Sequence, residues 1–294
     1  MNTLLSTNEP LVSVMMPAYN AEKSIGRALT SLILQSYKNW EVIVVNDGST
    51  DKTAEEVLKI TDKRIILVQH KANRGRASAR QTALEEARGD LIAYLDADDF
   101  YHPDKLRRQV KVMTLRTDLS LCGTAIGCFS SQGVLYRIRS DIPVTIARHV
   151  YSKPLPISPA TCIIRAKIAK SAKYTVWMRY GEDVDYLQRV LDKSAYANIS
   201  DILYYYAEFD DRGISKIISS YFPGIIRAMQ LIPRAPLSSF RFLFRRLIAL
   251  MGTGLYVATF GTEKLLMRRG RAPASEEALT FEASLTAIKK KFFL

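Results

Sequence analysis

The strongest constraint on the fold of this chain is an alternation of short apolar runs with helix-like stretches near its N-terminus. The apolar runs occupy residues 11–16, 40–45, 65–68 and 91–95. Stretches typical of helices lie between them, at residues 21–35, 51–60 and 76–88, and Gly89 is the expected C-terminal cap of the last one. An unbroken apolar run indicates a strand covered on both faces. We therefore predict an α/β fold with a mostly parallel, Rossmann-like central sheet and helices on both faces.

The alternation becomes less regular beyond residue 105. Strands are predicted at residues 119–129, 134–138 and 202–206, helices at 103–115 and 183–191, and a proline-rich loop at 153–159. From residue 214 onward the chain is expected to be helical, with breaks at its prolines. We divide the chain into a catalytic domain, residues 1–213, and a basic, amphipathic helical C-terminal region, residues 214–294. Within the first domain, a nucleotide-binding part spans about 10–106 and an acceptor part about 107–213.

The net charge of +13 is concentrated in the C-terminal region. Residues 211–294 contain 14 Lys or Arg and 5 Asp or Glu, a net charge of +9. Such an excess favours an anionic partner, either a membrane surface or nucleic acid, and a basic solvated face is the simpler alternative. Within this region residues 247–262 are uncharged, and Phe240, Phe242 and Phe244 precede them among arginines. This pattern is more typical of an interfacial helix than of a spanning one, with a helix packed on the catalytic domain as the alternative.

The cysteines and the N-terminus indicate a cytoplasmic protein. The three cysteines, Cys122, Cys128 and Cys162, lack C-x-x-C spacing, which argues against a disulfide framework or a zinc site. The first ten residues have neither the basic nor the apolar segment of a signal peptide. No stretch of the sequence is expected to reach the roughly 18 to 20 apolar residues of a membrane-spanning helix.

Polar residues follow each of the first four predicted strands, at residues 17–20, 46–49, 70–76 and 96–99. Ligands of open α/β sheets bind at the carboxyl ends of the strands, so these segments predict one binding edge. Neither a P-loop nor a G-x-G-x-x-G turn is present in the sequence. The sequence therefore argues against a P-loop nucleoside triphosphatase and against a Rossmann dehydrogenase.

Two acidic centres are candidate catalytic groups. Asp96, Asp98 and Asp99 would repel one another unless a cation or hydrogen-bond donors compensate, and Mg²⁺ or Mn²⁺ would also bind a diphosphate. The alternative is an acidic turn in which Asp99 caps the helix at 103–115. Glu182 and Asp183 precede the helix at 183–191, where they either stabilise its N-terminus or supply a general base.

At these residues the sequence resembles glycosyltransferase family 2, which has the GT-A fold. The resemblance runs from about residue 12 to 106, through the segments VSVMMPAYN, VNDGSTD and LDADD, and resumes at Glu182. It implies an inverting, metal-dependent transfer of a sugar from a nucleotide diphosphate sugar to an acceptor hydroxyl. The base pocket would be lined by Pro17, Ala18 and Tyr19. Asp47 would bind the nucleobase, usually uracil.

The same resemblance implies the remaining roles. Asn73 and Arg80 would help to hold the nucleotide, and Asp96 would contact the ribose. Asp98 would be the protein ligand of the divalent metal, Mn²⁺ or Mg²⁺, and Asp183 would be the catalytic base. The expected partners are a UDP-sugar donor, a glycan or lipid-linked acceptor of bacterial polysaccharide biosynthesis, and the anionic cytoplasmic face of a membrane.

Departures from the family pattern limit what the resemblance implies. Processive members carry a Q-x-x-R-W motif after the second acidic centre, and Gln188-Arg189-Val190 does not fit it, so we predict a non-processive enzyme. No histidine follows Asp183, so the metal shell would consist of Asp98, phosphates and water.

Three alternative functions are weaker. A sugar-nucleotide pyrophosphorylase would need a glycine-rich opening that the chain lacks. A nucleic-acid-binding module would leave the acids at the strand ends unexplained, because they repel phosphate. A glycan-binding protein without activity would not need both acidic centres.

Overall fold

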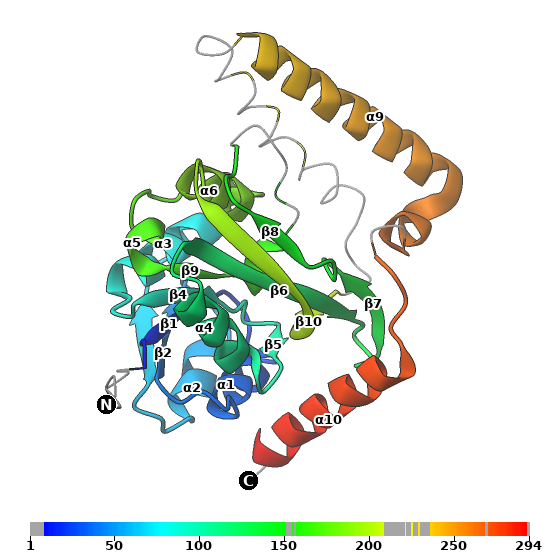
Figure 1. Ribbon diagram of the computed structural model, residues 1–294. Coiled ribbons are helices and arrows are strands. Elements are labelled where there is room, and N and C mark those ends of the chain that lie inside the picture. The colour runs from blue at the N-terminus through cyan, green and yellow to red at the C-terminus, as the bar shows by residue number, and fades with distance from the viewer. Residues whose placement is uncertain are drawn as a thin grey trace, which may run out of the picture.

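The structure is a computed structural model, and it describes residues 9–150, 155, 157–208, 221, 225, 229, 236–267 and 270–292. Figure 1 shows a central sheet between helices, with the long helix α9 (Pro236–Met267) standing apart from the sheet.

The four predicted apolar runs form four parallel strands, which confirms the predicted core of the fold. These strands are β1 (Val12–Ala18), β2 (Trp40–Asn46), β3 (Ile65–Gln69) and β4 (Leu91–Tyr94), in the spatial order β3-β2-β1-β4. Val14 of β1 is in register with Val42 of β2 and with Ala93 of β4. Because side chains alternate along a strand, Val12 and Val14 face one apolar cluster and Met15 faces the other.

Helices cover both faces of the sheet, as predicted. One face carries α1 (Ile25–Ile33), α2 (Thr53–Leu58) and α4 (Lys105–Leu115). The other face carries α3 (Arg76–Glu86), α5 (Ala166–Ala169) and α6 (Glu182–Val190). The short 3₁₀ helix η1 (Pro159–Thr161) packs between β4, β6 and α6.

The second half of the sheet is mixed and contains strands that the sequence did not predict. The strands are β5 (Phe100–Tyr101), β6 (Leu119–Phe129), β7 (Leu135–Arg139), β8 (Val144–Ile146), β9 (Ile163–Arg165) and β10 (Ala195–Ala207). The sheet continues in the order β4-β9-β6-β10-β5, with β9 antiparallel to both of its neighbours. Strands β5, β8 and β9 have two or three residues each, too few to show a period, and β10 begins earlier than the predicted residue 202.

The structure lacks two helix caps, the predicted cap at Gly89 and the alternative cap at Asp99. Asp99 does not cap α4, whose N-cap is Asp104, because Asp99 is fully buried in another hydrogen-bond network. Helix α3 ends at Glu86, before Gly89. A Cβ at Gly89 would lie 2.5 Å from the carbonyl oxygen of Leu11 and 2.7 Å from Ser13 Oγ, so glycine permits a close approach to β1.

Helix α10 (Ser275–Phe292) packs on the catalytic domain. Phe281 is buried against Phe100, Phe129 and Tyr205, with ring centroids 5.7, 5.6 and 5.1 Å away. Before the helix, Arg271 binds Asp141 at 2.6 Å and forms an antiparallel bridge with Ile138. The packed alternative for the C-terminal region therefore holds for α10.

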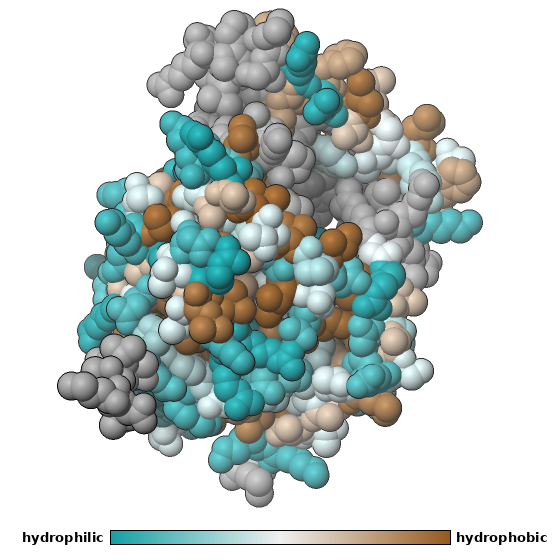
Figure 2. Space-filling view, in the orientation of Figure 1, coloured by the Kyte–Doolittle hydropathy of each residue, from teal (hydrophilic) through white to brown (hydrophobic). Residues whose placement is uncertain are grey.

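Helix α9 exposes an apolar face. Figure 2 shows hydrophobic residues gathered along it, at the upper right of the view. Among the described residues, one stretch, Phe240–Gly261, is long and apolar enough to cross a membrane by length and composition alone, with a mean hydropathy of 1.2. The expectation that no stretch reaches this length is therefore wrong, because the apolar stretch continues past Arg245 and Arg246 to Phe240. The helix bends at Gly261, where φ is 83°.

Candidate active site

A cavity of about 1060 Å³ opens where the predicted strand ends meet. It is bounded by the carboxyl ends of β1, β2 and β4, the N-terminus of α3 and the segment that precedes α6. Most of the predicted site residues line it: Pro17, Ala18, Tyr19, Asp47, Asn73, Asp96 and Asp98. Arg80 and Asp183 are not among its lining residues. The structure therefore brings most of the predicted residues to one cavity, while their individual roles remain predictions.

The side chain of Asp47 connects the loop after β3 to the end of β2 through hydrogen bonds. Its Oδ1 accepts hydrogen bonds from the backbone N–H of Arg74 at 3.0 Å and from His70 Nδ1 at 2.7 Å, and its Oδ2 accepts one from Gly75 N–H at 2.8 Å. A carboxylate offers about four acceptor positions, and these hydrogen bonds use three of them. The next residue must be glycine, because a Cβ on Gly48 would lie 2.4 Å from the backbone of Ala72.

Arg80 joins the two acidic centres. Its Nη2 donates to Asp96 Oδ1 at 2.9 Å, and its Nη1 donates to Glu182 Oε1 at 2.8 Å, 102 residues away in the sequence. Asp183 Oδ2 lies 3.8 Å from the same Nη1. Burial disfavours the charged guanidinium, but these three carboxylates outweigh it and raise the pKa of Arg80 well above its ordinary value. Arg80 thus lies behind the cavity wall as a bridge between carboxylates.

The acidic segment after β4 is anchored by groups that the sequence analysis did not identify. Asp99 is buried and accepts hydrogen bonds from Tyr204 Oη at 2.6 Å and Ala207 N–H at 2.7 Å. Burial, and then the neighbouring carboxylates, raise the pKa of Asp99 well above its usual range. Arg27 Nη2 donates to the carbonyl oxygen of Asp98 at 2.6 Å. Asp99 is therefore structural, which leaves Asp96 and Asp98 at the cavity. A run of three tyrosines in β10 was the only sequence signal for this anchor.

The carboxylates at the cavity can supply only one or two ligands to a divalent cation. The described residues contain no group of three or more His, Cys, Asp or Glu side chains that could hold a metal ion. Asp98 lines the cavity, while Asp96 binds Arg80. A hard cation that keeps water and phosphate oxygens as ligands needs only one or two protein carboxylates, so these residues fit Mg²⁺ or Mn²⁺ bound together with a diphosphate.

Asp183 is the more accessible acid of the second centre. Its side chain is 27% exposed, whereas that of Glu182 is 1% exposed. Burial raises the pKa of Glu182, and Arg80 opposes this effect. The preceding Gly181 has a φ of 70°, which is favourable for glycine and begins α6 at this point. The arrangement leaves Glu182 paired with Arg80 and Asp183 open to the solvent side.

One further part of the cavity wall was missed. Residues 176–180 line the cavity directly before α6, in a region for which the sequence analysis assigned no acceptor residues. The available signal was the pairing of Trp177 and Tyr180 with Arg179 in a short segment before an acidic pair.

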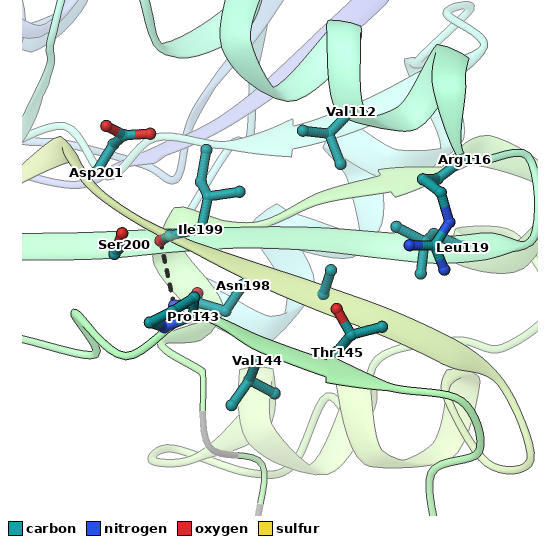
Figure 3. A pocket seen from close by; sticks show the side chains of 11 residues that line it. Val112, Arg116, Leu119, Pro143, Val144, Thr145, Asn198, Ile199, Ser200 and Asp201 are labelled. Carbon is teal, nitrogen blue, oxygen red and sulfur yellow. Dashed lines mark hydrogen bonds between the residues drawn. The ribbon is translucent and has the colours of Figure 1, made fainter.

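A second hollow of about 460 Å³ lies between α4, β8 and β10 (Figure 3). Arg116 and Asp201 stand at its opposite ends, but Arg116 binds Asp118 and Asp201 binds Arg108. Asn198 Nδ2 donates to the carbonyl oxygens of Ser140 and Ile199. The charged side chains that line this hollow are thus engaged within the protein, which favours the larger cavity as the functional site.

Comparisons with known proteins agree with this geometry. The model of the family described as Glycosyl transferase family 2 matches residues 13–171, more than half of the chain. The putative glycosyltransferase EpsE of Bacillus subtilis is 30% identical over 248 residues, which cover 81% of this chain and 88% of EpsE. An Escherichia coli relative, the UDP-Glc:alpha-D-GlcNAc-diphosphoundecaprenol beta-1,3-glucosyltransferase WfgD, is 44% identical over 110 residues. That match covers 37% of this chain and only 43% of WfgD.

A solved structure shows the same fold. Residues 1–349 of TarS from S. aureus, in complex with UDP, superpose with a TM-score of 0.62 at 21% sequence identity, over 94% of this chain and 79% of the TarS chain. The predicted GT-A fold is confirmed by this likeness. Because the family model covers more than half of the chain and EpsE aligns with most of it, this chain belongs to glycosyl transferase family 2.

Proposed function

We propose that this protein is an inverting, non-processive glycosyltransferase that moves one sugar from a UDP-sugar to an acceptor hydroxyl. The observation that carries the proposal is the linkage of both acidic centres through Arg80 beside one cavity. At about 1060 Å³ the cavity is large enough for a nucleotide sugar and part of an acceptor.

The donor end is supported by Asp47. Its carboxylate lines the cavity and accepts three hydrogen bonds, and we assign its fourth acceptor position to the nucleobase. The imide N–H of uracil is a suitable donor for that position, whereas cytosine has no N–H there. Solved complexes of S. aureus TarS with UDP and with UDP-GlcNAc are consistent with a uridine donor.

The reaction is a single displacement at the anomeric carbon. Asp183 accepts the proton of the acceptor hydroxyl, whose oxygen bonds to the anomeric carbon as the bond from that carbon to the diphosphate oxygen breaks. Attack from the face opposite the leaving UDP inverts the configuration. Asp98 would hold a divalent cation, which would supply positive charge for the departing diphosphate. Arg80 keeps Asp96 and Glu182 in place, so that both acidic centres keep a fixed separation.

The proposed acceptor is a lipid-linked or surface glycan of bacterial polysaccharide biosynthesis. The name of the relative WfgD includes a diphosphoundecaprenol acceptor, which supports this class. The apolar face of α9, with exposed arginines such as Arg241 and Arg245, would dock on the anionic cytoplasmic face of the membrane.

The test is a screen of nucleotide sugars with Mn²⁺ that measures the release of nucleoside diphosphate. We expect UDP release from at least one UDP-sugar, and inhibition by UDP at concentrations at least about tenfold lower than by CDP, since one hydrogen bond to a charged group distinguishes the bases. Equal inhibition by UDP and CDP would refute the role of Asp47. No release from any UDP-sugar would refute the uridine donor.

A further inference from the structure

The segment of residues 176–180 presents large side chains to the cavity. Trp177 is 58% exposed and Tyr180 is 40% exposed, and Arg179 is exposed between them. All three line the cavity. A tryptophan side chain exposed at a cavity wall would gain a large free energy of burial if a ligand covered it. Such a side chain is therefore a candidate ligand contact.

The segment is held firmly although its tips are exposed. Tyr174, just before it, stacks on Tyr186 with centroids 4.0 Å apart, and its backbone N–H donates to Gln81 Oε1 at 2.9 Å. Thr175 Oγ1 donates to Asp185 Oδ2 at 2.9 Å. Met178 is buried, and its N–H donates to the carbonyl oxygen of Thr175 at 3.0 Å, which closes a turn with Trp177 inside it. The exposed side chains are therefore presented by a fixed backbone.

In the chain the segment lies apart from the residues proposed to form the nucleotide-binding wall. That wall consists of residues 17–21, Asp47 and the loop at residues 73–76. Residues 176–180 lead directly through Gly181 to Glu182 and Asp183, and Glu182 is tied through Arg80 to Asp96 rather than to Asp47. The segment thus reaches the cavity beside the proposed base, where an acceptor hydroxyl has to lie.

We propose that residues 176–180 form the acceptor subsite and that it takes a glycosyl diphosphate, with the sugar ring stacked on Trp177. This inference rests on the proposed transferase function and identifies the residues that bind its acceptor. The C–H face of a pyranose packs on the flat indole, and the Tyr180 ring adds a second apolar surface with a polar hydroxyl. Arg179 supplies a planar cationic group suited to a phosphate. Stacking there would direct one ring hydroxyl toward Asp183.

Intrinsic fluorescence can test the subsite directly. The only other tryptophan, Trp40, is 1% exposed and lies under the Arg64 guanidinium, so an aqueous quencher such as acrylamide reaches Trp177 first. The probe is decyl diphosphate carrying one α-linked N-acetylglucosamine. We expect the probe to lower acrylamide quenching of the wild-type protein by about twofold or more, because the ring covers the indole, and UDP alone to leave it nearly unchanged.

Kinetics of transfer to the same probe provide the second measurement. Trp177→Ala should raise the KM for the probe by about tenfold or more, and Trp177→Phe, which keeps an aromatic face, should recover most of that loss. The affinity for UDP, measured by calorimetry, should change less than about twofold in both variants. Leu115→Ala, a change of another exposed apolar side chain that does not line the cavity, is the control and should alter neither value.

Two results would overturn the inference while leaving the transferase proposal intact. One is protection of Trp177 by UDP but not by the probe. The other is a loss of UDP affinity in Trp177→Ala with an unchanged KM for the probe, which would assign the segment to the donor. By contrast, a wild-type protein that releases UDP from no UDP-sugar would refute the proposed function, and this inference with it.

Discussion

At the scale of single residues, Arg80 determines which acidic groups of the site are paired with a buried positive charge. It is 2% exposed and binds Asp96 and Glu182, which lie on different elements. Removing one partner of a buried ion pair leaves the other charge without compensation, so these groups depend on one another. Asp96 and Glu182 are therefore hydrogen-bonded to Arg80. The acids whose catalytic roles we test are Asp98 and Asp183.

The first prediction concerns Asp98. Asp98→Asn should abolish metal-dependent release of UDP from a UDP-sugar, because an amide is a much poorer ligand for Mn²⁺ than a carboxylate. The protein should stay folded, since the segment is anchored by Asp99 and by the carbonyl oxygen of Asp98. The assay compares UDP release with Mn²⁺ and with EDTA, and Asp118→Asn, an exposed change, is the control. Wild-type activity that persists in EDTA would contradict the prediction.

The second prediction concerns Asp183. Asp183→Asn should lower turnover by about 10²-fold or more, since the amide cannot take a proton from the acceptor hydroxyl. The backbone N–H of Val184 donates to Asp183 Oδ1 at 2.7 Å, and the amide oxygen of asparagine preserves this bond. Steady-state turnover and calorimetry with UDP are the measurements. Reduced affinity for UDP together with full turnover at saturation would assign the base to another residue.

At the scale of elements, β10 anchors the acidic segment after β4, and α4 carries a buried lysine. The last residues of β10 bind Asp99 across 105 residues of sequence, so the strand fixes the acidic segment after β4. Helix α4 follows this segment after the short strand β5 and begins with Lys105, a fully buried lysine. Lys105 Nζ donates to Gln109 Oε1 at 2.6 Å and lies 4.2 Å from the centroid of the Tyr101 ring. A buried ammonium without a carboxylate among its bonded neighbours is a pH-sensitive feature of this helix.

The third prediction follows from burial of Lys105, which lowers its pKa to about 7. An unfolded lysine has a pKa near 10.4, so between about pH 7 and 10 the unfolded chain binds the additional proton. The free energy of unfolding should therefore rise with pH in this window, by up to about 1.4 kcal/mol per pH unit from this group, and this contribution is lost progressively as the pH falls from about 10 to about 7. Lys105→Met lacks this contribution.

Urea denaturation at several pH values between 7 and 10 would measure the contribution of Lys105 to the free energy of unfolding. The wild-type protein should gain stability relative to Lys105→Met as the pH rises. The exposed Lys111 on the same helix offers the control, and Lys111→Met should follow the wild-type profile. Parallel profiles for the wild type and Lys105→Met would contradict the prediction.

At the scale of the whole molecule, the two C-terminal helices behave differently. Phe281 and Ile288 of α10 are buried in the aromatic cluster behind β5 and β6, so α10 is part of the packed body. By contrast, α9 exposes Phe240, Phe244, Leu247, Ile248, Met251 and Leu255, which occupy positions i, i+4, i+7, i+8, i+11 and i+15 of the helix. Such spacing places these side chains on one face of the helix. A membrane test should therefore change α9 and leave α10 intact, since removing α10 would expose the core.

The fourth prediction tests docking of α9. Full-length protein should sediment with vesicles that contain phosphatidylglycerol, and binding should weaken with salt, because each basic residue near an anionic surface contributes about 1 kcal/mol. The double variant Met251→Glu, Leu255→Glu should stay in the supernatant, as it places charge on the apolar face. Leu58→Glu, Leu115→Glu, two equally exposed positions on the catalytic domain, is the matched control. Wild-type protein that remains in the supernatant at low salt would refute docking.

The sequence by itself determined the parallel half of the sheet and the place of the site. Strands β1 to β4 are mostly apolar segments of four to seven residues, and that pattern is local. Polar residues after such strands collect at one edge in any parallel sheet, so Asp47, Asp96 and Asp98 could be assigned to one cavity before their contacts were known.

Only the tertiary structure decided which of these groups are bound by residues distant in the sequence. The bond of Arg80 to Glu182, the anchoring of Asp99 by Tyr204 and the docking of Phe281 on Phe100 all join residues distant in sequence. The short strands β5, β8 and β9 likewise exist because of the neighbours with which they pair. Periodicity reports how a segment can be buried, whereas the identity of its neighbours depends on how the chain returns, and no local pattern encodes that choice.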